Sequence, residues 1–97
     1  MDSKLKDKNV DSLFEAVLTL QNLEECYRFF EDVCTVNEIK AIAQRFAVAK
    51  MLTQKKVYSD IVQETGASTA TISRVNRSLT YGNDGYALVM ERLKSEN

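Results

Sequence analysis

The stretch that decides the fold runs from Val57 to Leu79 and is VYSDIVQETGASTATISRVNRSL. Two short segments with helical spacing of apolar residues lie on either side of Gly66, and Ser68 follows two positions later. A glycine at a helix C-terminus readily takes left-handed backbone, and a serine is a good cap for the next helix. We therefore predict two short helices joined by a turn at Gly66, which is a helix-turn-helix.

Apolar residues in both segments give this predicted motif its internal packing. Those in the second segment recur at three- and four-residue spacing, so they share one helix face. We expect them to hold the two helices together at a steep angle. The residues are Ile61 in the first helix and Ile72, Val75 and Leu79 in the second.

The leading end of the second helix carries short side chains, Thr69, Ala70 and Thr71. Such side chains let a helix enter the major groove and bring hydroxyls and methyls to base edges. Helix-end amides and nearby cations then hold phosphates. The predicted DNA-binding residues are Lys55, Lys56, Ser68, Thr69, Ala70, Thr71, Ser73, Arg74 and Arg77. The competing interpretation is that a Ser/Thr-rich turn merely caps a helix in an ordinary bundle.

The distribution of charge bears on this choice. The 97-residue chain has a net charge of -1, which argues against a protein covered in positive charge. Met1–Ala49 holds six basic and nine acidic residues, whereas Lys50–Asn83 holds five and two. Positive charge is thus concentrated around the predicted motif, as in a compact nucleic-acid-binding element, although a solvated helix face would carry the same charges.

The chain before the motif contains neither proline nor glycine, so long helices are expected there. Met1–Asn9 is a charged segment that we expect to be a flexible arm preceding one helical domain over residues 10–97. The first helix is expected to start at Asp11 or Ser12. A second starts at Asn22 and ends near Cys34.

Thr35 and Glu38 form a predicted capping box, which opens a third, central helix reaching Leu52. After the motif, the turn cluster Tyr81–Gly85 precedes a last amphipathic helix with Asp84 as its expected cap, and Lys94–Asn97 is expected to be frayed. The fold class is therefore all-α. Because so short a chain buries a limited share of its surface, association into a homodimer is expected.

Several function classes are excluded by what the sequence lacks. There is no histidine, so Cys26 and Cys34 build neither a Cys/His metal site nor a Cys-His nucleophile, and we expect buried free thiols. Paired carboxylates and Gly-rich phosphate loops are also missing, so neither an enzyme nor a cofactor is predicted. No signal segment or membrane-length apolar run occurs, which predicts a cytoplasmic protein.

From about Leu13 to Leu93 the sequence resembles the tryptophan repressor family, and more closely its YerC/YecD branch. The most specific stretches are GASTATISR, from Gly66 to Arg74, and the Thr35–Arg45 segment. The resemblance implies a bacterial transcription regulator, a repressor, with a six-helix subunit and an intertwined dimer that binds pseudo-palindromic operators.

The resemblance also implies an effector site formed by Thr35, Arg45, Arg74 and Ser78. The family has a small glycine directly after the recognition-helix arginine, whereas this chain has Val75. Extra volume in a fitted pocket is costly, so tryptophan is not expected to bind, and an unknown effector or none remains open. Without an effector, Arg45 would pair with an acidic neighbour and Arg74 with a phosphate.

A second departure lies in the first helix of the motif, where the family has basic and amide side chains at positions occupied here by Tyr58, Ser59 and Val62. Fewer phosphate contacts predict weaker DNA binding, or binding at other DNA sequences, than in the better-known family members. The alternative function is a helical protein-interaction module that kept the fold and lost DNA binding.

Overall fold

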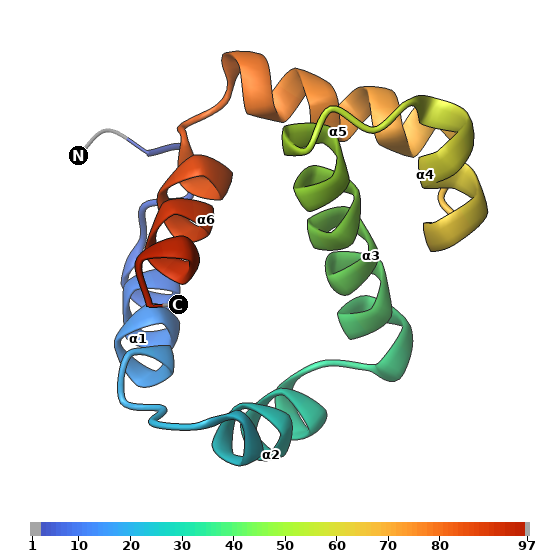
Figure 1. Cartoon of the computed structure of the whole chain (residues 1–97). Helices are drawn as coiled ribbons and strands as arrows, with labels where there is room; N and C mark the ends of the chain where they lie inside the picture. Colours follow the sequence, from blue (N-terminus) through green and yellow to red (C-terminus); the bar gives the residue numbers. More distant parts are fainter. Residues whose placement is uncertain (1–2, 97) are drawn as a thin grey trace. The chain divides into compact units, whose positions relative to one another are not determined.

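The computed structural model describes residues 3–96, and all regular structure in that range is helical, as predicted (Figure 1). The six helices are α1 (Lys8–Val17), α2 (Leu23–Val33), α3 (Val36–Thr53), α4 (Tyr58–Thr65), α5 (Thr69–Tyr81) and α6 (Gly85–Ser95). The chain divides into two compact units, Met1–Val36 and Asn37–Asn97. Of the helices in the described range, none combines the length and apolar character that crossing a membrane requires.

The first helix starts earlier than predicted. Asp7 is the N-cap of α1, and its Oδ1 accepts a hydrogen bond from the Val10 N–H at 2.8 Å. Asp11 and Ser12 therefore lie inside the helix, and Asp11 instead accepts a bond from the Lys6 ammonium at 2.7 Å. The prediction missed this start because Asp7 lies in a charged segment without apolar periodicity.

The predicted N-terminal arm is thus shorter than Met1–Asn9. Lys8 and Asn9 belong to α1, and a turn closed by the Lys6 N–H and the Ser3 carbonyl precedes it. Residues 1 and 2 lie outside the described range, as does Asn97 of the predicted C-terminal tail. Lys94 and Ser95 of that tail are part of α6.

The second helix begins and ends where the sequence predicts. Asn22 caps α2 by accepting a bond from the Glu25 N–H at 2.9 Å, and Cys34 follows its last residue. Both cysteines are free, as expected, but they are half-buried rather than buried. Both cysteines belong to the first unit, where no described residue of α1 or α2 is buried in the single chain.

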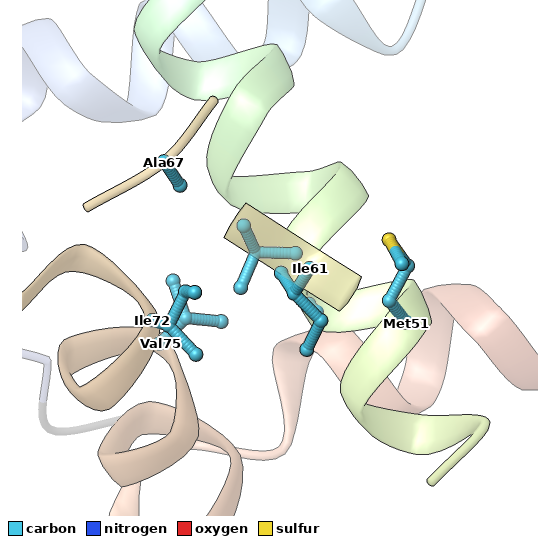
Figure 2. Close-up of a cluster of buried hydrophobic side chains, with 7 residues drawn as sticks. Met51, Ile61, Ala67, Ile72 and Val75 are labelled. Atoms are coloured by element: carbon cyan, nitrogen blue, oxygen red, sulfur yellow. The ribbon is translucent and has the colours of Figure 1, made fainter. Parts of the chain in front are cut away.

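The core lies in the second unit, where the C-terminal half of α3 packs against α4 and α5 (Figure 2). Ile61, Ile72 and Val75 are buried as predicted, and Leu79 is half-buried at the edge of the cluster. This core therefore joins the two helices of the motif to a long supporting helix. Its buried residues are Val48, Ala49, Met51, Ile61, Ala67, Ile72 and Val75.

The last helix packs against the margin of this core through Tyr86 and Met90. Asp84 occupies its N-cap position, but the residue has a left-handed backbone (φ 61°) and its side chain makes no capping hydrogen bond. The predicted cap is therefore wrong. Left-handed backbone differs from the extended conformation from which a cap side chain reaches the first turn.

Candidate nucleic-acid interface

The turn between α4 and α5 is held from several directions. Gly66 takes φ 72°, and its N–H donates to the Val62 carbonyl at 2.9 Å, so the helix ends as predicted. The Ala67 N–H donates to the Thr65 hydroxyl at 3.1 Å, and Gln44 on α3 donates to the Thr65 carbonyl at 3.1 Å. These bonds fix the direction in which α5 leaves the turn.

Some of the predicted base-contacting residues at the start of α5 hydrogen-bond to each other, and the others are exposed. Ser68 is the N-cap, as predicted, and its Oγ accepts from the Thr71 N–H at 3.1 Å. Thr71 is half-buried, and its hydroxyl lies 3.1 Å from the Ser68 hydroxyl in a hydrogen bond. Thr69, Ala70 and Ser73 are exposed. The exposed tip of α5 thus presents two hydroxyls, of Thr69 and Ser73, and two methyls, of Thr69 and Ala70.

The predicted phosphate-binding cations all lie in the second unit, on or beside the motif. Arg74 and Arg77 are exposed on α5, and Lys55 and Lys56 are exposed in the turn between α3 and α4. Exposed cations around a protruding helix end can contact the backbone of a duplex whose groove that end enters.

The residues of the predicted effector site are distributed over both units. Thr35 belongs to the first unit and directly precedes α3. Arg45 is half-buried on α3, whereas Arg74 and Ser78 are exposed one turn apart on α5. Val75, next to Arg74, is only 2% exposed and belongs to the core. The space next to Arg74 on the buried face of α5 is therefore filled by the Val75 side chain.

Ser78 also lines an open pocket of about 480 Å³ within the second unit. Phe46 of α3 and Tyr86 of α6 stack in its wall, with ring centroids 6.4 Å apart and planes inclined by 27°. This pairing was not predicted from the sequence, because it depends on where α6 folds back against α3. The other lining residues are Gly82, Asn83, Gly85 and Val89.

A short α4, a glycine-closed turn and a capped α5 with an exposed small-residue tip define a helix-turn-helix protein. The model for the Trp repressor protein family matches residues 8–94. The chain belongs to the Trp repressor family, which confirms the resemblance inferred from its sequence.

Individual relatives agree with this assignment. The chain is 57% identical over 91 residues to the uncharacterized protein YerC of Bacillus subtilis, covering 94% of this chain and 88% of that protein. A TrpR-like protein from Eubacterium eligens has a crystal structure that matches with a TM-score of 0.92 and 62% identity, covering 96% of each chain. A protein proposed to be a Trp repressor from Staphylococcus aureus matches with a TM-score of 0.90 and 57% identity, covering 94% of this chain and 91% of that one.

Proposed function

We propose that this protein is a sequence-specific DNA-binding transcription regulator that represses by occupying pseudo-palindromic operators as a homodimer. The single observation that carries the proposal is the tip of α5, where Thr69, Ala70 and Ser73 are exposed on a helix anchored by a buried core. Small hydroxyl and methyl groups on a rigid helix end suit contact with base edges in the major groove. Membership of the Trp repressor family supports the same function.

Dimer formation is supported by the apolar surface of the single chain. On α1 and α2 and at the C-cap of α1, large apolar residues stay exposed although they have helical spacing, including Phe14, Leu18 and Tyr27. On α6, Leu88, Val89 and Leu93 are also more than two-fifths exposed. So much exposed apolar surface on a small chain marks an interaction site, and a second copy offers the same complementary surface.

DNA binding is proposed to be modest in affinity and to depend on salt less steeply than binding through many phosphate contacts. Tyr58 and Ser59 at the start of α4 are exposed and uncharged, so this helix end offers its amides and two hydroxyls, but no cation, to phosphate. The cationic contacts then come from Lys55, Lys56 and the α5 arginines. Fewer phosphate contacts mean a smaller loss of affinity as the salt concentration rises.

No tryptophan is needed in this proposal. Val75 fills core volume beside Arg74, and a flat ring entering there would have to displace a branched side chain from a packed site. Any other effector is proposed to contact the polar residues Arg45, Arg74 and Ser78 of the second unit.

The experiment compares Ala70→Glu with Ala70→Gln in binding to a labelled duplex from the protein's own promoter region, by fluorescence anisotropy at two salt concentrations. Position 70 is exposed in the first turn of α5, where an acidic side chain suits the helix dipole, so both variants are expected to fold. The carboxylate repels phosphate, and Ala70→Glu should lose binding by at least about tenfold more than its uncharged isostere.

Thermal unfolding of both variants serves as the folding control. Equal, weak, salt-independent binding by wild type and both variants would contradict the DNA-binding proposal. It would favour a helical protein-interaction module instead, in which the α5 tip contacts a protein partner.

A further inference from the structure

The turn that ends α3 contains a left-handed residue that is not glycine. Lys55 has φ 63°. Its N–H donates to the Leu52 carbonyl at 3.0 Å, and the Lys56 N–H donates to the Met51 carbonyl at 3.1 Å. These two bonds make a Schellman motif, in which the left-handed position is the one that glycine usually occupies.

The same chain shows how such positions are filled elsewhere. Among the described residues, positive φ angles occur at Lys55, Gly66 and Asp84. Glycine has no Cβ to clash, and aspartate tolerates the conformation because its short polar side chain bonds locally. Lysine has neither property. Lys55 is therefore the residue type least suited to its backbone conformation among these three.

The fold itself does not require a lysine at this position. Both hydrogen bonds of the turn join backbone groups, so glycine would retain them. The Lys55 side chain is exposed, as is that of Lys56. What lysine adds is a cation at the entrance to α4, on the same unit as the exposed tip of α5.

We propose that Lys55 contacts a DNA phosphate, and that its charge is retained at the expense of stability, so that affinity and stability are opposed at this residue. The inference rests on the proposed function, which already includes a phosphate contact by Lys55. It adds to that function that the contact is made by a residue with a strained backbone and lowers stability. Strained residues persist where the surrounding structure enforces them, and they concentrate at functional positions.

The experiment measures thermal unfolding and duplex binding across a salt series for Lys55→Gly, Lys55→Asn and Lys55→Arg. Lys55→Gly relieves the strain and removes the charge, so the melting temperature should rise by roughly 2–6 °C. Its affinity for the duplex should fall by roughly three- to tenfold. The slope of log K against log salt should decrease by about 1.8, because each protomer of the proposed dimer loses one phosphate contact. Lys55→Asn should change both quantities in the same directions, and Lys55→Arg should change neither.

Two other exposed lysines provide controls, Lys56 in the same turn and Lys40 near the start of α3. Lys56→Gly removes a charge from the same turn at a residue without positive φ, so it should not raise the melting temperature. Lys40→Gln removes an exposed charge from α3 outside the turn and should leave the salt slope unchanged.

The outcomes separate this inference from the proposed function. If wild type binds the duplex and Lys55→Gly retains its affinity and salt slope, the phosphate contact is refuted while DNA binding stands. If Lys40→Gln weakens binding as much as Lys55→Gly does, the loss comes from the overall charge of the protein. The specific contact by Lys55 is then refuted as well. A lower melting temperature for Lys55→Gly than for wild type refutes the inferred backbone strain at Lys55. If wild type binds no duplex at all, the proposed function fails first.

Discussion

At Gly66 the backbone conformation, rather than a lack of space, explains why glycine is present. A Cβ built on this residue would meet only the Gln44 Nε2 at 4.0 Å, but φ is 72°. Gly66→Ala should therefore lower the free energy of unfolding by about 1 kcal/mol through backbone strain alone. Chemical denaturation of the purified protein measures this loss.

Gly85 is the matched control for this prediction. Nothing lies within 4 Å of a Cβ built there, its φ is not in the left-handed range, and it is the first residue of α6. Gly85→Ala should leave stability unchanged or raise it slightly, since alanine favours the helix. If both alanine variants behave alike, the left-handed turn is not the reason for glycine at position 66.

At the scale of one element, α5 performs two tasks with opposite faces. Its buried face places Ile72 and Val75 in the core, and its exposed face presents Thr69, Ala70 and Ser73. The buried face makes the tip rigid, because a core residue cannot move without opening a cavity. The same packing fills the volume into which a flat ring would have to enter.

We therefore predict that wild-type protein gives no heat when titrated with tryptophan in a calorimeter. Val75→Gly removes a buried side chain from mid-helix and should lower the free energy of unfolding by roughly 3 kcal/mol. A folded Val75→Gly variant is expected to gain tryptophan binding, and Arg74→Ala on that background should remove it. Tryptophan binding by wild type that Arg74→Ala abolishes would contradict the prediction.

At the scale of the whole molecule, the single chain leaves many large apolar side chains exposed to water. Leu18 is 83% exposed directly after α1, and no described residue of α1 or α2 is buried. Surface of this kind becomes stable when it is covered by a second chain. The operator symmetry proposed for this protein requires the same assembly.

We predict that wild type has the mass of a dimer in size-exclusion chromatography with light scattering. Leu18→Asp should shift the protein to monomer, because a charge buried in an apolar interface is strongly unfavourable. Ser12→Asp places the same charge on an exposed residue inside α1 and should leave the dimer intact. A wild-type monomer, or equal behaviour of the two variants, would contradict the dimer proposal.

How far the site was predictable depends on the range of the interactions involved. The glycine turn, the Ser68 cap and the buried Ile61, Ile72 and Val75 were all predicted, because each follows from φ preference or from spacing of three and four residues. The Thr71 hydroxyl was expected at the DNA interface, and its bond to Ser68 was not anticipated. Which hydroxyls remain free depends on rotamers that neighbouring side chains select.

By itself, then, the sequence determined that the chain is all-helical, where the motif lies and which residues close it, since these are local properties of the backbone. Only the tertiary structure decided the left-handed conformation of Lys55, the failure of Asp84 to cap α6, and the stacking of Phe46 on Tyr86. The first two depend on how the chain must turn to bring α4 and α6 against α3. The third joins residues forty positions apart, and no local preference encodes a contact over that separation.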